Sequence, residues 1–351
     1  MSETIRQPAA GALLAWYDAN RRTLPWRAEP GERADPYRVW LSEIMLQQTN
    51  VTTVKPYFAK FLDLFPTVEA LAAAAEGDVM AAWAGLGYYS RARNLHACAK
   101  AVVDRGGFPS EERWLLDLPG IGPYTAAAIA SIAFGKVAAA VDGNVERVMS
   151  RVHAIETAFP AARSEVAERT LAIVPKERPG DFAQAMMDLG SMVCRPTSPK
   201  CGECPWAEAC VANARAEQER FPVKLKKSGG EPRYGVAYVA RRRDGAILLR
   251  TRPGTGLLGG MAEVPVSDWT RQEAPASAPP LPGPWRVLPG SVKHVFTHFP
   301  LELAIWAADL PMDTSPPEGT RWVAPSEMAS EALPSLMRKV VAHADKPALL
   351  L

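Results

Sequence analysis

The sequence predicts two domains of different fold class: an all-α domain, followed by a smaller α+β domain. Apolar residues recur at helical spacing up to about residue 215, and strand-like runs begin after Gly229. Four of the five cysteines fall within residues 194–210, close to the end of the helical part. The 351 residues, 48% of them hydrophobic, are enough to bury two separate cores.

The helical part begins with a polar start and then repeats short amphipathic segments. Asp35 followed by Pro36 is a typical helix start, with a capping carboxylate and a proline at the first helical position. A helix is predicted from there through YRVWLSEIMLQQ. Further helices are predicted at residues 8–20, 52–64, 67–83, 90–104, 123–134, 143–154, 164–174 and 181–192.

The second domain is predicted from extended runs. Arg243-Asp244-Gly245 has the composition of a hairpin turn between YGVAYVARR and AILLRTR. Later strands are expected in KHVFTHF, LELAIWAA and RWVAP, and a last helix at 334–344. We expect domains at residues 1–215 and 232–351, joined by an exposed polar linker at 216–231.

Composition excludes several classes of protein. The net charge is only +2, so a nucleic-acid surface has to be local. The polar N-terminal stretch predicts no signal peptide, and the longest alanine-rich run is too interrupted for a membrane span. We therefore expect a cytoplasmic protein with no membrane contact, in which clustered cysteines indicate metal rather than disulfides.

Cys194, Cys201, Cys204 and Cys210 have the spacing C-x6-C-x2-C-x5-C. Four thiolates this close require a cation. An iron–sulfur cluster is favoured, while zinc is the alternative, since zinc sites more often consist of two C-x2-C pairs. Arg195 and Lys200 lie in the loop between the first two cysteines, where they either dock a phosphate or form ordinary solvated surface charge.

Residues 118–126 read LPGIGPYTA. Gly120 and Gly122 permit a tight turn with positive backbone torsions, and Pro123 starts the next helix with its amides directed outward. Such a turn can bind a phosphate without reading sequence. An ordinary glycine turn between two helices is the simpler interpretation of this motif alone.

Several motifs in one order resemble a known family. LPGIGPYTA, then VDGNVERV (141–148) and the cysteines resemble the helix-hairpin-helix DNA glycosylase superfamily. SEIMLQQTNV (42–51) and GLGYYSRARNL (85–95) resemble its adenine DNA glycosylase (MutY) members. RPGTGLLGGMAEVP (252–265) resembles their MutT-like, or Nudix, second domain. The resemblance implies a helix-hairpin-helix element at 118–134, a 4Fe–4S cluster on the four cysteines, and a Nudix-like α+β domain at 232–351.

The catalytic residues are expected from chemistry and resemblance together. Base excision needs a proton for the leaving base and an anion to stabilise the oxocarbenium-like sugar. Glu43 sits in an otherwise apolar helix, where burial would raise its pKa; a solvated helix face is the plainer interpretation. By resemblance Glu43 is the proton donor, Asp142 the anion, and Asn144 the support of Asp142 and the water. Tyr124 stands where strand-cutting relatives carry a Schiff-base lysine, which implies a monofunctional glycosylase.

The resemblance extends less specifically to residues that contact DNA. Gln48 and Tyr88 match residues that enter the base stack, while Arg27 and Asp188 match the adenine pocket. Phe296, Thr297 and His298 match the segment that reaches 8-oxoguanine. The stretch that follows residue 265, VSDWTRQEAPASAPP (266–280), holds one glutamate, Glu273, so Nudix hydrolysis of nucleotides is not expected.

The function implied is hydrolysis of the N-glycosidic bond of adenine mispaired with 8-oxoguanine or guanine, by a monomer bound to double-stranded DNA. Three alternative functions agree less well with the sequence. Tyr124 disfavours a glycosylase–lyase for oxidised pyrimidines, and the joint presence of Glu43 and Asp142 disfavours an iron–sulfur regulator without catalysis. The missing glutamates disfavour a nucleotide pyrophosphohydrolase.

Overall fold

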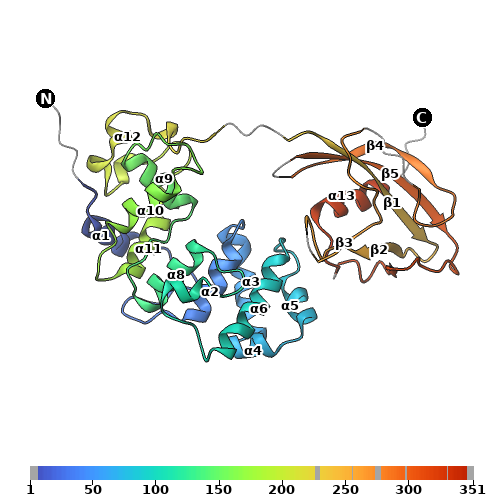
Figure 1. Cartoon of the computed structure of the whole chain (residues 1–351), viewed down its shortest axis with the longest axis horizontal. Coiled ribbons are helices and arrows are strands. Elements are labelled where there is room, and N and C mark those ends of the chain that lie inside the picture. Colours follow the sequence, from blue (N-terminus) through green and yellow to red (C-terminus); the bar gives the residue numbers. More distant parts are fainter. Residues whose placement is uncertain are drawn as a thin grey trace. The chain divides into compact units, whose positions relative to one another are not determined.

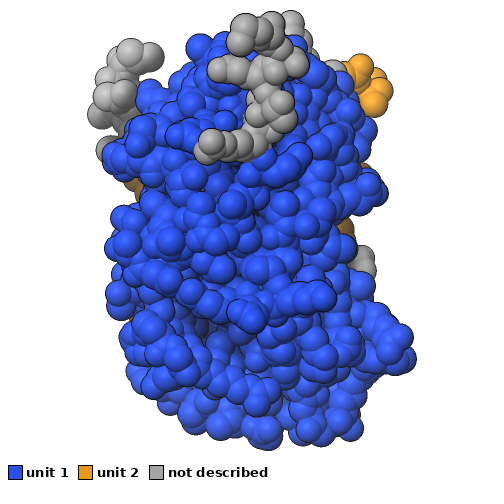
Figure 2. Space-filling view, turned by 90° about the vertical axis from the view of Figure 1, so that its left-hand side faces the viewer, with its two compact units in different colours: residues 1–82, 93–226 blue, residues 83–92, 227–351 orange. Residues whose placement is uncertain are grey.

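The computed structural model describes residues 7–225, 230–254, 256–272, 278–296, 299–329 and 331–345. The chain forms two compact units: residues 1–82 with 93–226, and residues 83–92 with 227–351 (Figures 1 and 2). Each unit is described by itself below. No helix among these described residues is long and apolar enough to span a membrane.

Helices build the N-terminal part of the chain, as predicted (Figure 1). Their bounds are α1 Ala10–Asn20, α2 Pro36–Leu46, α3 Val51–Leu64, α4 Val68–Ala73, α5 Glu76–Trp83, α6 Ser90–Asp104, α7 Glu112–Leu115, α8 Pro123–Phe134, α9 Gly143–Val152, α10 Arg163–Leu171, α11 Pro179–Asp188 and α12 Val211–Ala214. A single π-helical turn, η1 (Leu189–Val193), continues α11.

Local sequence signals explain where the helices begin and end. The Asp35 side chain accepts a hydrogen bond from the Tyr37 amide (2.8 Å), which fixes the start of α2. Helix α8 begins at Pro123 and ends at Gly135, whose left-handed backbone (φ 66°) only glycine adopts readily. The prediction of one helix over 67–83 is wrong, because Ala74 is extended (ψ 153°) and separates α4 from α5.

One core cluster of the helical unit includes residues as far along the chain as Val223. Helices α1, α9 and α11 pack around it, together with Trp206 and Phe221, each 1% exposed. The Phe159 amide also bonds to the carbonyl oxygen of Val223 (3.0 Å). Phe221 and Val223 therefore dock part of the expected linker on the helical unit.

The second unit is built on one mixed sheet. Its strands are β1 Arg233–Arg242, β2 Ile247–Thr251, β3 Ala262–Glu263, β4 Arg286–Val295, β5 Pro300–Leu310 and β6 Thr320–Val323, in the order β3-β2-β1-β5-β4 with β6 beside β2. The hairpin predicted at 243–245 joins β1 to β2, whereas β1 and β5 are parallel. Helix α13 (Ser335–Ala344) contributes Leu336 and Met337 to the core beneath this sheet.

Candidate active site

Glu43 lies on α2 with only 7% of its surface exposed. It lines a cavity of the helical unit together with Arg27, Trp26, Gln184 and Met187. Burial raises the pKa of Glu43 to about 7, with the negative charge of Asp142 adding to the effect, and the hydrogen bond from Tyr124 opposing it. A carboxyl group with this pKa holds its proton for a large fraction of the time at neutral pH.

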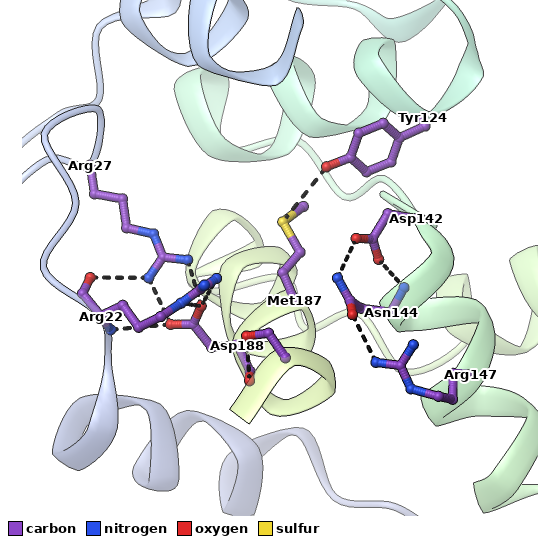
Figure 3. A network of polar contacts seen from close by, with 9 residues as sticks. Arg22, Arg27, Tyr124, Asp142, Asn144, Arg147, Met187 and Asp188 are labelled. Atoms are coloured by element: carbon purple, nitrogen blue, oxygen red, sulfur yellow. Dashed lines mark hydrogen bonds and ion pairs between the residues drawn. The ribbon is translucent and has the colours of Figure 1, made fainter. Parts of the chain in front are cut away.

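Tyr124 lies in the first turn of α8 and donates a hydrogen bond from its hydroxyl to Glu43 Oε2 (2.6 Å). The same hydroxyl is 3.7 Å from Met187 Sδ (Figure 3), and with its bond to Glu43 it joins α8 to both α11 and α2. Burial raises the pKa of the Tyr124 phenol well above its ordinary value. The phenol therefore stays protonated at neutral pH and remains a hydrogen-bond donor to Glu43.

Asp142 is the N-cap of α9, as its position in the sequence suggests. Its Oδ1 accepts hydrogen bonds from the amides of Asn144 (2.9 Å) and Val145 (2.8 Å), and Asn144 Nδ2 donates to Oδ2 (2.8 Å). Arg147 in turn donates to Asn144 Oδ1 (2.8 Å), as Figure 3 shows. A Cβ at Gly190 would lie 2.5 Å from Asn144 Cβ, so only glycine in η1 leaves room for this arrangement.

Asp188 lies behind the cavity and is 0% exposed. Arg27 donates two hydrogen bonds to its carboxylate (2.7 and 2.8 Å), and Arg22 Nε donates a third (2.6 Å; Figure 3). Although burial opposes ionisation, the hydrogen bonds and charge of Arg27 hold the pKa of Asp188 below its ordinary value. Asp188 is thus a partner of the arginines, and it is not among the residues that line this cavity.

Sequence reasoning singled out Arg27 and Glu43 of the cavity wall but missed other polar residues there, among them Arg22 and Gln184. Gln184 lies on α11, one helical turn before Asp188, and faces the cavity. A single polar residue on a helix is normally a solvated one, so only its spacing from Asp188 hinted at a position near the site.

The four cysteines of the cluster motif line one cavity, together with Arg151 and Trp206. The Arg151 guanidinium donates hydrogen bonds to Cys194 Sγ (3.4 Å) and to the Arg195 carbonyl oxygen (2.7 Å). These sulfurs surround one space and one of them already accepts a charge-assisted hydrogen bond, which fits a bound iron–sulfur group. No group of three or more His, Cys, Asp or Glu side chains in the described chain is arranged to hold a single metal ion.

Comparison with known proteins identifies the family. Residues 41–176 match the HhH-GPD superfamily of base excision DNA repair proteins, and residues 236–343 match the NUDIX domain. The chain is 36% identical to the adenine DNA glycosylase of Homo sapiens, covering 94% of this chain and 72% of that protein. The chain belongs to the adenine DNA glycosylase family.

A second relative agrees with this assignment. The adenine DNA glycosylase of Mus musculus is 35% identical, over 93% of this chain and 76% of that protein. Among solved structures, a thermostable thymine-DNA glycosylase superposes with a TM-score of 0.53 at 31% identity, covering 59% of this chain and 95% of that one. This adenine DNA glycosylase is accordingly a base excision repair enzyme that hydrolyses N-glycosyl bonds.

The hairpin of the glycosylase needs its two glycines for different reasons. Gly120 has φ 74°, and a Cβ there would lie 2.7 Å from Asn94 Cβ on α6. Gly122 has φ −96°, so the expectation of a positive torsion there is wrong. A Cβ at Gly122 would meet open space among the described residues, next to a helix start that no described side chain caps.

Gln48 and Tyr88 both have left-handed backbone, with φ of 56° and 49°. Non-glycine residues rarely adopt this conformation, which is found more often at functional sites. The Tyr88 side chain is 58% exposed, with the Arg91 guanidinium 5.5 Å from its ring centroid.

In the second unit Phe296 packs within the domain, stacked on Trp269 (5.7 Å between ring centroids) and tilted against Phe299 (5.3 Å). Thr297 and His298 lie outside the described residues. Glu263 is 1% exposed and is bound by Arg250 and Arg252, and residues 264–272, all described, form no helix. The glutamate-bearing helix of a Nudix hydrolase therefore does not follow β3 over these residues.

Proposed function

We propose that this glycosylase removes adenine from double-stranded DNA where adenine stands opposite 8-oxoguanine or guanine, with Glu43 as proton donor and Asp142 as the stabilising anion. The observation that carries the proposal is the buried Glu43 on a cavity wall, hydrogen-bonded to Tyr124 at 2.6 Å. The family assignment supports adenine as the base, and the site chemistry supports the two roles.

The proton donor acts on the leaving base. The Glu43 carboxyl transfers its proton to a ring nitrogen of adenine as the bond between that base and the sugar C1′ breaks, so adenine leaves neutral. Tyr124 holds one carboxylate oxygen and leaves the other directed to the substrate. Water then adds to C1′ and gives a proton to the Glu43 carboxylate, which completes the hydrolysis and restores the acid.

The second carboxylate stabilises the charge that develops on the sugar. Asp142 is held by two amides at the start of α9 and by the Asn144 side chain, so its position is fixed before the substrate binds. A fixed anion costs no reorganisation in the transition state. Asn144 thereby positions Asp142, and Arg147 positions Asn144.

The cavity suits a flat, apolar base with a polar edge. Leu46, Val51 and Ile132 provide apolar walls, while the Gln184 amide can both donate and accept hydrogen bonds. Adenine presents an amino donor beside a ring acceptor, and an amide side chain matches that pair. We propose Gln184, rather than Asp188, as the residue that reads the adenine edge.

Binding of the DNA uses several sites in this proposal. The open helix start at Gly122 binds a phosphate, with Gly120 shaping the turn. Gln48 and Tyr88 enter the base stack and offset the few kcal/mol of unstacking that flipping costs. Thr297 and His298 of the second unit contact the base opposite adenine, and Phe296 anchors their segment in the domain core.

Strand scission is expected only after hot alkali, because the Tyr124 phenol cannot form an imine with the sugar. The measurement compares strand cleavage of a duplex carrying adenine opposite guanine, with and without alkaline work-up, while free adenine is quantified by chromatography. Borohydride trapping as efficient as that of a true lyase would contradict the monofunctional assignment. Absence of free adenine would contradict the function itself.

We propose that Cys194, Cys201, Cys204 and Cys210 hold a 4Fe–4S cluster. When bound, the cluster supplies structure to residues 194–210 rather than a step of the hydrolysis. Arg195 and Lys200 have partners inside this segment, since Arg195 bonds to the Ser198 carbonyl oxygen (2.8 Å) and Lys200 to Glu203 (3.1 Å). The hydrogen bond of Arg195 and the ion pair of Lys200 are both exposed, and each can exchange for a DNA phosphate at little cost.

Metal analysis of anaerobically purified protein is expected to find iron and inorganic sulfide in equal amounts, about four of each per chain. Cys201→Ser is expected to lower both and to weaken DNA binding. Cys98→Ser is the matched control, because Cys98 is buried on α6 outside the cluster cavity. One zinc per chain without sulfide would establish the zinc alternative.

A further inference from the structure

Two arginines line the same cavity as Glu43, and the Asp188 carboxylate compensates their positive charge. Arg22 and Arg27 line the same cavity as Glu43, which must keep a proton near neutral pH. Positive charge close to a carboxyl group favours its ionised form. Two uncompensated arginines would therefore oppose the role proposed for Glu43.

The contacts show how this charge is compensated. Asp188 is fully buried and receives two hydrogen bonds from Arg27 and one from Arg22, with the Arg22 amide at 3.2 Å as a fourth. The Arg27 guanidinium also lies over the Tyr17 ring, 5.8 Å from its centroid. Arg27 is thus held from two sides, and the N–H groups of its guanidinium donate to Asp188 rather than to Glu43.

We propose that Asp188 is a positioning residue whose carboxylate neutralises Arg22 and Arg27 and so keeps Glu43 protonated for catalysis. This inference rests on the function proposed above. It differs from a base-contacting role, because Asp188 acts through the arginines and does not touch adenine.

The charged groups that face Glu43 come from each element packed against it. Tyr124 on α8 and Arg27 from the loop after α1 favour its ionised form, while Asp142 at the start of α9 favours its neutral form. Removing the Asp188 charge frees Arg27 beside Glu43, which lowers the pKa of Glu43. Removing Arg27 instead takes away a cation and raises that pKa.

The test is the pH dependence of single-turnover adenine release. The wild-type rate should fall as pH rises through about 7, because only protonated Glu43 acts. In Asp188→Asn this fall should move to lower pH by about one unit, which makes release about tenfold slower on the alkaline side. The rate should recover toward wild type at low pH.

Removing the arginine instead of the aspartate should shift the pH profile in the opposite direction. Arg27→Gln should move the fall to higher pH, and Asp188→Asn combined with Arg27→Gln should return it toward the wild-type position. Asp181→Asn is the matched control, since this carboxylate is on the same helix but pairs with Arg178 at the surface (2.8 Å). It should leave the profile unchanged.

The outcomes distinguish a failure of the positioning role of Asp188 from a failure of the role proposed for Glu43. A uniform loss of rate in folded Asp188→Asn, with the profile unmoved, overturns the positioning role and leaves Glu43 in place. If Asp188→Asn does not fold, as judged by circular dichroism, an unmoved profile in Arg27→Gln overturns it. If the wild-type fall near pH 7 persists in the residual activity of Glu43→Gln, the proposed function of Glu43 fails instead.

Discussion

Glu43→Gln is expected to slow single-turnover adenine release by about 10²–10⁴-fold, the usual contribution of a general acid. Glutamine keeps the size of the side chain and can still accept the hydrogen bond from Tyr124, so only the transferable proton is lost. Because a neutral amide replaces a carboxyl group with a pKa of about 7, binding to mismatched duplex should change little.

The control for this substitution is Glu69→Gln, at an exposed position on α4. It should leave release unchanged, with at most a small fall in melting temperature, because Glu69 is an acidic residue in the first turn of α4. Wild-type release rates in Glu43→Gln would remove Glu43 from the mechanism, and an equal loss of duplex binding would make it a binding residue instead.

Asp142→Asn is expected to slow release by about 10²-fold or more, since a fixed anion aimed at developing positive charge contributes on that scale. The substitution separates catalysis from helix capping. Asparagine caps helices about as well as aspartate, so the side-chain oxygen can still accept from the amides of Asn144 and Val145. The melting temperature should fall only modestly, because both backbone caps remain while the hydrogen bond from Asn144 Nδ2 to Oδ2 is lost.

Asp35→Asn is the matched control. Asp35 caps α2 in the same way, but it lies at the opposite end of that helix from Glu43. Single-turnover kinetics and thermal melts of both variants are compared. If Asp142→Asn only lowers the melting temperature and leaves the rate intact, Asp142 is a cap and nothing more.

Elements with strong local signals were predictable from the sequence. Helix α8 has the predicted bounds, because Pro123 sets its start and Gly135 its end. The break at Ala74 was not predictable, since alanine favours helix, and Gly77, the nearest residue that disfavours it, lies inside α5. The two-residue strand β3 was too short to show alternation, and the parallel pairing of β1 with β5 depends on residues far apart in the chain.

The candidate site likewise has some features that the sequence could predict and others that it could not. The structure brings Glu43 and Tyr124, 81 residues apart, to 2.6 Å. The sequence could not show which residues of α11 face the cavity, because neighbouring positions on a helix differ by about 100°. Asp188 was therefore expected on the wall, whereas Gln184 lies there. Gly122 was expected to have a positive torsion because two glycines in one turn look equivalent in sequence.

Base release from a set of duplexes tests the central claim most directly. Adenine is placed opposite 8-oxoguanine, guanine, cytosine or thymine, and a duplex with thymine opposite guanine represents the substrate base named for the thymine-DNA glycosylase with the same fold. At fixed salt, free adenine is expected from the 8-oxoguanine and guanine duplexes, with far slower release opposite thymine. Release of thymine in place of adenine, or equal release of adenine opposite all four bases, would contradict the account.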